Sequence, residues 1–201
     1  MFDARLRPLI DPTLNKGGRW LAEMGIRANH VTFIGFGFGV AAALFIALGS
    51  LWLGLLCVAL NRLCDGLDGA VARINGKTDL GGYLDIVLDF FFYGAVPLAF
   101  AVMNPGANAL AAAMLLFSFY ANGSTFLAFS TMAEKRGLET DRQGSKSLYY
   151  LGGLAEGGET IAVFCVMCLW PSGFAILAYG FAAICVLSAA ARVIGSAKLL
   201  S

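Results

Sequence analysis

Six long apolar segments run through this sequence, and they constrain its fold more than any other feature. Each is close to the roughly 20 residues that a helix needs to cross the hydrocarbon core of a bilayer. Of the 201 residues, 59% are hydrophobic and 13% are charged, whereas a soluble domain is nearer to a quarter charged. The sequence therefore predicts an all-α integral membrane protein with six transmembrane helices, over residues 31–50, 51–72, 80–103, 107–132, 149–170 and 172–194.

The N-terminal segment, up to about residue 28, is too polar to cross a membrane. Apolar side chains are interleaved there with Arg and Lys, which is typical of an amphipathic helix lying in the membrane interface. Asp11-Pro12 predicts a break in this helix, because proline removes a helical hydrogen bond. A solvated arm is the alternative. We expect one membrane domain over residues 1–201, with an interfacial segment at 1–28 and a six-helix core at 29–201.

Lys and Arg are distributed unequally among the connections between these segments. They occur before the first span, between the second and third, between the fourth and fifth, and at the end of the chain. The other connections contain none. Because positively charged loops stay on the cytoplasmic side, both termini and the polar chemistry are predicted to face the cytoplasm. The net charge of +1 creates no field that would attract nucleic acid.

Four carboxylates lie inside or at the ends of the second and third spans: Asp65, Asp68, Asp85 and Asp89. A charge at the bilayer centre costs about 2.5–3.5 kcal/mol on insertion scales, so such residues need a strong reason. Asp65 and Asp68 are three residues apart and Asp85 and Asp89 are four apart, so each pair shares a helical face. Because the connection between the spans is short, we expect antiparallel neighbouring helices that bring all four acids to a similar depth.

Four carboxylates in a small volume repel one another, so they would either protonate or bind a cation. Oxygen ligands favour Mg²⁺, Ca²⁺ or Mn²⁺. Gly66 and Gly69 would let a flat group approach the backbone beside the acids, and Arg73 offers a guanidinium fork for phosphate. The alternative is a packing network in which Arg62, Arg73 and Lys77 neutralise the acids.

The acids belong to a spaced signature that resembles the CDP-alcohol phosphotransferase family, Asp65-x2-Asp68-Gly69-x2-Ala72-Arg73-x7-Gly81-x3-Asp85-x3-Asp89. The stretch Asn29-His30-Val31-Thr32 resembles the start of that family's domain. The six predicted spans and the interfacial N-terminal helix also agree with it. The sequence is similar to small bacterial inner-membrane members of the family.

The resemblance implies a phospholipid-synthesising enzyme that transfers a phosphatidyl group from CDP-diacylglycerol to the hydroxyl of an alcohol and releases CMP. It implies Mg²⁺ or Mn²⁺, as a pair of ions, and Asp89 as the base that takes the acceptor's proton. It also implies a homodimer in a bacterial inner membrane. The metal ligands would be Asp65, Asp68, Asp85 and Asp89, and the CDP-binding residues Asp65, Gly69, Ala72, Arg73 and Thr32.

The acceptor is left open by the sequence, and the candidate pocket residues are Arg62, Arg136, Glu156 and Glu159. Glu156 and Glu159 are three residues apart on one predicted helical face. They could bind an amine or polyol, in which case they would repel a phosphorylated acceptor. They could instead form an ion pair with Arg62 or Arg192 that joins two helices. Arg62 lies within a span and needs a partner, either Asp65 or an acid of the fifth span.

Other functions remain open at this stage. CDP-ethanolamine or CDP-choline could be the donor, with diacylglycerol as the acceptor. A divalent cation transporter could use the same acids, although pathway acids usually lie at the bilayer midplane. A regulatory membrane protein with a decayed active site is a further alternative, although every signature residue is present.

Overall fold

The computed structural model describes residues 2–137 and 157–200, and these residues form helices and no strand. The predicted all-α fold is therefore confirmed. The elements in chain order are α1 (Phe2–Glu23), α2 (Ala28–Ala47), α3 (Leu51–Asn75), α4 (Asp79–Met103), α5 (Pro105–Lys135), α6 (Gly157–Leu169), the 3₁₀ turn η1 (Pro171–Gly173) and α7 (Phe174–Leu200).

Short polar connections set the boundaries around α4. Gly76 ends α3 with φ 91°, a left-handed value that glycine adopts without a steric penalty. The Thr78 hydroxyl accepts a hydrogen bond of 3.1 Å from the Gly81 amide and caps the start of α4. Asn104 caps α5 in the same way through the Ala107 amide. The boundary between the two signature helices is therefore set by a glycine turn and a threonine cap.

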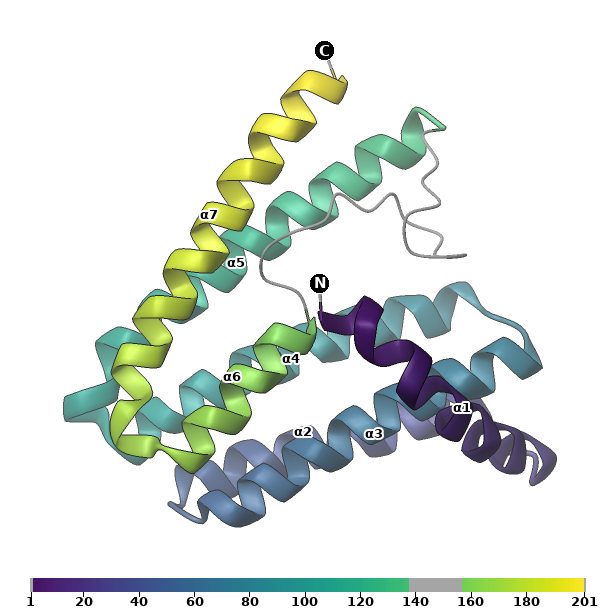
Figure 1. Cartoon of the computed structure of the whole chain (residues 1–201), viewed down its shortest axis with the longest axis horizontal. Coiled ribbons are helices and arrows are strands. Elements are labelled where there is room, and N and C mark those ends of the chain that lie inside the picture. The colour runs from purple at the N-terminus through teal and green to yellow at the C-terminus, as the bar shows by residue number, and fades with distance from the viewer. Residues whose placement is uncertain (1, 138–156, 201) are drawn as a thin grey trace.

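The helices converge at one end of the molecule and separate toward the other (Figure 1). α2 packs against both α3 and α4, α5 packs against α4 and α7, and α1 and α6 pack against α3. α3 and α4 make no comparable contact with each other. The expectation that α3 and α4 are neighbours agrees with the side-chain contacts between them, from Arg62 to Asp89 and to Phe92. Their backbones, however, approach each other closely at few points. α2 lies against both helices, and side chains bridge the space between α3 and α4.

A continuous apolar core fills the convergent end, which we call the closed end. It is formed by the second half of α2, the first halves of α3, α5 and α7, the second half of α4, and α6. Aromatic rings dominate it: Phe100 stacks on Phe174 at 4.7 Å, and Phe164 lies edge-on to Phe92 at 6.0 Å. The divergent end, which holds the signature acids, is called the open end below.

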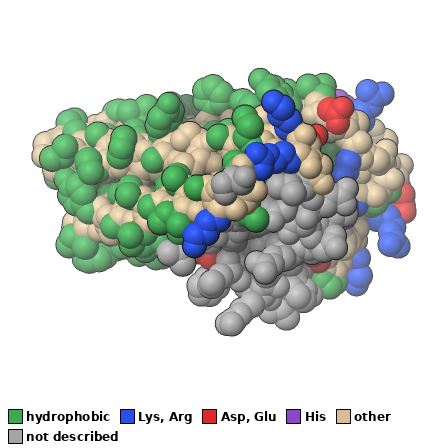
Figure 2. Space-filling view, turned by 90° about the horizontal axis from the view of Figure 1, so that it is seen from above, with side chains coloured by type: hydrophobic (Ala, Val, Ile, Leu, Met, Phe, Trp, Pro, Cys, Tyr) green, Lys and Arg blue, Asp and Glu red, His purple; other side chains and the backbone are tan. Residues whose placement is uncertain are grey.

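Large apolar side chains also cover much of the outer surface, and they gather over the closed end and the middle of the molecule (Figure 2). Lys, Arg, Asp and Glu gather toward the open end. Such extensive exposed apolar surface indicates contact with lipid. Four described helices are long and apolar enough to span a membrane: α2, α4, α5 and the stretch Pro171–Leu200. The number of six spans stays a prediction.

The N-terminal helix α1 is continuous from Phe2 to Glu23, so the predicted break at Asp11-Pro12 is wrong. A proline removes one backbone hydrogen bond, and the packing of α1 on α3 supports the helix across this position. The contact is close: a Cβ on Gly18 would lie 2.5 Å from the Cβ of Ala70. α1 therefore lies directly on the helix that carries Asp65 and Asp68.

Candidate active site

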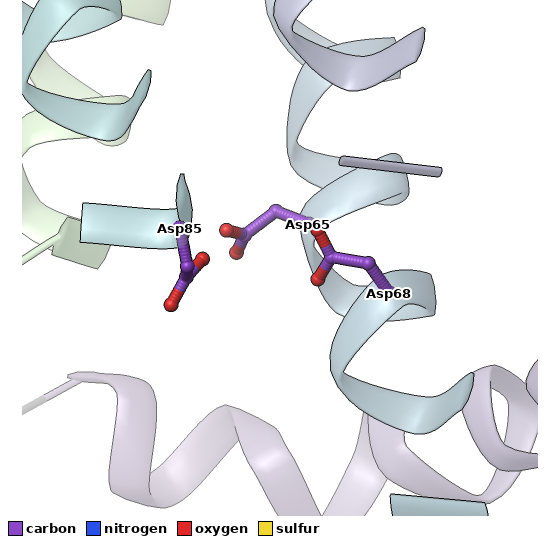
Figure 3. A group of neighbouring side chains, drawn as sticks. All are labelled: Asp65, Asp68 and Asp85. Atoms are coloured by element: carbon purple, nitrogen blue, oxygen red, sulfur yellow. The ribbon is translucent and has the colours of Figure 1, made fainter. Parts of the chain in front are cut away.

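Three aspartates from two helices meet at the open end (Figure 3). Asp65 and Asp68 are one turn apart in α3, and Asp85 comes from the first half of α4. One carboxylate oxygen of each lies within 4.8 Å of the others. Asp68 is buried, Asp65 is partly buried and Asp85 is exposed. The structure thus brings three of the four predicted acids together across the space between α3 and α4.

This three-aspartate group can hold a divalent cation. An ion bound by oxygens at 2.0–2.1 Å keeps opposite ligands about 4.2 Å apart. Oxygens that already lie within 4.8 Å of one another would need only small side-chain rotations to reach that geometry. The ligand atoms are all carboxylate oxygens, which suits Mg²⁺ or Mn²⁺.

Thr32 of α2 orients the buried member of the group. Its hydroxyl lies 2.7 Å from Oδ2 of Asp68 and 3.1 Å from the backbone oxygen of Ala28. A hydroxyl has a single proton to donate, and the shorter contact goes to the charged carboxylate. Thr32, singled out in the sequence as CDP-binding, therefore contacts an acid of the site directly.

Asp89 lies beside the three-aspartate group and does not belong to it. Nη2 of Arg62 donates to Oδ1 of Asp89 at 2.6 Å, and the Tyr93 hydroxyl donates to Oδ2 at 3.3 Å. Nη1 of Arg62 lies 3.5 Å from Oδ2 of Asp65. Arg62 therefore pairs with Asp65, as expected, and also with Asp89. The role of Asp89 as a metal ligand stays a prediction.

A pocket opens between α2, α3 and α4. The carboxylates and the guanidinium form its polar wall, and α2 contributes an apolar and backbone wall. The lining residues are Thr32, Gly35, Phe36, Asn61, Arg62, Asp65, Asp68, Asp85, Leu88 and Asp89. A polar ligand that enters this pocket therefore meets all four acids.

The two signature glycines have different roles. A Cβ on Gly66 would lie 2.7 Å from Cδ1 of Leu14, so this glycine makes room for α1 and not for a ligand. A Cβ on Gly69 would meet only Nη1 of Arg73, at an ordinary 3.5 Å, so the backbone beside Asp68 stays accessible. The expectation that a flat group can approach the backbone is thus wrong for Gly66, and the open space at Gly69 is compatible with it.

The remaining donor-site candidates lie on the same stretch of α3. Ala72 is partly exposed and Arg73 is exposed. Nη2 of Arg73 donates to Oδ1 of Asn15 in α1 at 2.9 Å, which holds the guanidinium near Gly69. The roles of Asp65, Gly69, Ala72 and Arg73 in CDP binding stay predictions.

The acceptor candidates are more dispersed. Glu159 is a partly buried residue in the first turn of α6. Arg136 is exposed at the end of α5, and its Nη1 lies 3.4 Å from the backbone oxygen of Leu199. Glu156 lies outside the described residues. Arg192 is buried in α7, and its Nη1 donates to Asn122 and Thr125 of α5.

Sequence reasoning missed Tyr93, Asn61 and Phe92. Tyr93 is four residues after Asp89 on the same face of α4, and this spacing could have indicated it. Asn61 directly precedes Arg62, and its Oδ1 accepts from Nε of Arg62 at 3.0 Å. Phe92 lies under the guanidinium at 5.3 Å, a contact between α3 and α4 that no local pattern predicts.

Comparison with known proteins finds relatives over most of the chain. The sequence model of the family described as CDP-alcohol phosphatidyltransferase matches residues 26–195. An inner membrane protein of Escherichia coli K12, YnjF, is 47% identical over 193 residues, which is 96% of this chain and 94% of that protein. The archaetidylinositol phosphate synthase of Pyrococcus horikoshii is 36% identical over 87 residues, covering 43% of this chain and 46% of that one.

Solved structures share the fold. The phosphatidylinositol phosphate synthase of Mycobacterium tuberculosis with CDP-DAG bound superposes with a TM-score of 0.73 and 24% identity, over 91% of this chain and 92% of that chain. The same enzyme in complex with manganese and citrate gives a TM-score of 0.71 over 91% and 88% of the two chains, again at 24% identity. With the family model covering most of the sequence and both signature helices, this chain belongs to the CDP-alcohol phosphatidyltransferase family and is a membrane transferase of phospholipid synthesis.

Proposed function

We propose that this protein transfers the phosphatidyl group of CDP-diacylglycerol to the hydroxyl of a small polar alcohol, with release of CMP. The observation that carries the proposal is the group of Asp65, Asp68 and Asp85, whose carboxylate oxygens lie within 4.8 Å of one another. This group is part of the family's signature and lies at the open end, where charged side chains gather.

The metal assignment is part of this proposal. Asp65, Asp68 and Asp85 would hold Mg²⁺ or Mn²⁺, and Asp89 would complete the shell if two ions bind. When bound, the ions supply positive charge that neutralises the donor's pyrophosphate and the developing charge on CMP. The manganese complex of the Mycobacterium tuberculosis enzyme supports this choice of ion.

The nucleotide of the donor would lie along α3. Gly69 leaves the backbone open beside Asp68, and Ala72 presents only a methyl group in the following turn. Arg73 would give its guanidinium to the donor's phosphates, a geometry that suits a planar fork. Thr32 would contact the nucleotide from α2, next to its bond with Asp68. The two acyl chains would stay in the surrounding lipid.

Asp89 would act as the general base. It takes the proton of the acceptor hydroxyl as the acceptor oxygen forms a bond to the donor's β-phosphorus, which carries the diacylglycerol. The bond between that phosphorus and the bridging oxygen breaks, and its electron pair leaves with CMP. Asp89 lines the pocket that holds the other acids, so its carboxylate is available on the side where substrate would enter.

The acceptor is the least constrained substrate. Two related proteins are synthases of archaetidylinositol phosphate and of phosphatidylinositol phosphate, so inositol phosphate is the first acceptor to test. Glu159 and Glu156 would favour an uncharged polyol or an amine, since carboxylates repel a phosphorylated acceptor. Arg136 would instead attract a phosphorylated acceptor. Glu159→Gln should therefore improve the use of a phosphorylated acceptor if Glu159 lines the acceptor pocket.

We further propose one domain over the whole chain, six spans, cytoplasmic termini and a cytoplasmic opening of the pocket. The Lys and Arg distribution supports this sidedness. An inner-membrane location is supported by the Escherichia coli relative. A homodimer is expected for a member of this family, and the exposed apolar faces of the helices offer surface for it.

The test is CMP release by the purified protein with CDP-diacylglycerol and Mg²⁺ or Mn²⁺, across a panel of acceptors. The panel contains inositol phosphate, glycerol 3-phosphate, inositol, glycerol, serine and ethanolamine. One acceptor that raises CMP release and yields the matching phospholipid establishes the reaction. A parallel arm offers CDP-ethanolamine or CDP-choline with diacylglycerol, and turnover confined to that arm would reverse the assignment of donor and acceptor.

A further inference from the structure

Both carboxylate oxygens of Asp89 are held by side chains outside the metal-ligand set. We propose that Arg62 and Tyr93 form a positioning clamp that fixes the carboxylate of Asp89 beside the three-aspartate group and aims it at the acceptor hydroxyl. The clamp consists of the Arg62 Nη2 bond to Oδ1 at 2.6 Å and the Tyr93 hydroxyl bond to Oδ2 at 3.3 Å. This inference deepens the proposed function and rests on it, because it concerns the base of that reaction.

Arg62 is itself immobilised from several directions. Nε donates to Oδ1 of Asn61 at 3.0 Å, and Nδ2 of Asn61 donates to the Gly35 backbone oxygen at 2.8 Å. The guanidinium carbon lies 5.3 Å from the ring centre of Phe92 and 5.8 Å from that of Tyr93. Each of the three nitrogens has a partner, so the guanidinium is built to hold acids of its own chain rather than an acceptor phosphate.

Tyr93 is fixed by the helix opposite. A Cβ on Gly157, at the start of α6, would lie 3.1 Å from the Tyr93 hydroxyl. The Tyr93 ring also lies 6.4 Å from the ring of Phe164. The hydroxyl therefore sits between α4 and α6, and its hydrogen bond to Asp89 is supported by the closed end of the molecule. The clamp joins the aromatic core to the acidic pocket.

The geometry leaves Asp89 free to act. A carboxylate has about four lone-pair positions, and the clamp occupies one on each oxygen. About two positions are left for the acceptor's proton, and Asp89 lines the pocket that a substrate would enter. A base must be held within about 0.5 Å of its productive position, and a side chain with two anchored oxygens meets that requirement better than a freely rotating one. The Arg62 charge, which contacts both carboxylates, offsets part of the repulsion between Asp65 and Asp89.

The clamp is tested with Arg62→Lys and Tyr93→Phe, and Arg19→Lys on the exposed face of α1 is the matched control. Lysine keeps the charge but cannot contact Asn61, Asp65 and Asp89 together. We expect Arg62→Lys to lower kcat by about 10–100-fold and Tyr93→Phe by about fivefold. The KM for the CDP donor and the unfolding temperature should stay near wild type in both, and the control should match wild type throughout.

A purely structural role gives a different pattern. Arg62→Lys would then lower the unfolding temperature and leave kcat of the folded protein unchanged, which overturns the clamp. A rise in donor KM in place of a fall in kcat would also overturn it. If Arg62→Lys fails to fold, Tyr93→Phe decides, because it keeps the ring under the guanidinium and removes only the hydroxyl.

A second readout does not depend on turnover. In metal-free protein, a hydrophobic carbodiimide labels accessible carboxyl groups, and mass spectrometry compares Asp89 with the exposed Asp85. We expect weak labelling of Asp89 in the wild type and severalfold stronger labelling in both clamp variants. Equal labelling in all proteins would overturn the clamp. Absence of CMP release by the wild type would count against the proposed function alone, since the labelling result stands apart from it.

Discussion

The closed end and the open end of this protein are built from the same helices but differ in the side chains that lie between those helices. At the closed end, side chains of α2, α4, α5, α6 and α7 interlock in an aromatic core with buried members such as Phe100, Phe164 and Phe174. At the open end, α3 and α4 stay apart, and the space between them is lined by four carboxylates and one guanidinium. Apolar contact holds the first region together, whereas at the second the ion pair of Arg62 with Asp89 is a polar link between the two helices.

This contrast separates stability from function within one bundle. Burial of aromatic side chains at the closed end fixes the angles between the helices, and those angles set the width of the pocket at the other end. Carboxylates at the open end cannot contribute the same packing, so their arrangement depends on the closed end. Substitutions at the two ends should therefore change different measured quantities, and this can be tested directly.

The largest effect should come from removing divalent ions. We expect a chelator such as EDTA to abolish CMP release, and Mg²⁺ or Mn²⁺ to restore it, because Asp65, Asp68 and Asp85 alone leave the donor's pyrophosphate charge unbalanced. The unfolding temperature should change little, since the closed end contains none of these ligands. Turnover that continues in chelator would show that the three-aspartate group is not a metal site for the reaction.

The next effect in size should come from Asp89→Asn. An amide cannot take the acceptor's proton, and general-base catalysis contributes about 10²–10⁴-fold, so kcat should fall by that amount. The affinity for the CDP donor should persist, and equilibrium binding of a radiolabelled donor measures it. A variant that retains wild-type turnover would remove Asp89 as the base.

A substitution at the closed end should show the opposite behaviour. Phe164→Ala removes a fully buried ring that contacts Phe92, Tyr93 and Phe119. The cavity should destabilise the protein by about 3 kcal/mol, measured by thermal or denaturant unfolding in lipid nanodiscs. The donor KM of the protein that remains folded should be unchanged. A large rise in donor KM without loss of stability would contradict the division between the two ends.

The smallest effects should separate the two signature glycines. Gly69→Ala places a methyl group at ordinary contact distance from Arg73, so stability should stay level or rise by up to about 1 kcal/mol from helix propensity. The methyl would face the proposed nucleotide position, so the donor KM should rise severalfold. Gly66→Ala places a methyl 2.7 Å from Cδ1 of Leu14, the flexible end of a side chain that can move aside, so the donor KM should stay near wild type. Identical behaviour of the two variants would refute this distinction.

The sequence predicted the helices and the chemistry well, and it failed where contacts are long-range. Apolar length gave the positions of α2, α3, α4 and α5, and the signature gave the acids, because both are local or regularly spaced patterns. The predicted break of α1 at Asp11-Pro12 is wrong, because packing on α3 supports a continuous helix there. The short connection indicated correctly that α3 and α4 are neighbours, but it did not show that they meet through side chains such as Arg62 and Asp89 and have few close backbone contacts.

The sequence by itself determined that this chain is a helical membrane protein with a cluster of carboxylate oxygens. The length of the apolar segments and the spacing of the signature residues can both be read along the linear sequence. Only the tertiary structure decided how the acids divide, with Asp65, Asp68 and Asp85 together and Asp89 held by Arg62 and Tyr93. It also assigned Gly66 to helix packing and left Gly69 open. The physical reason is that partners across helices are chosen by the packing angle of the whole bundle, which no single segment encodes.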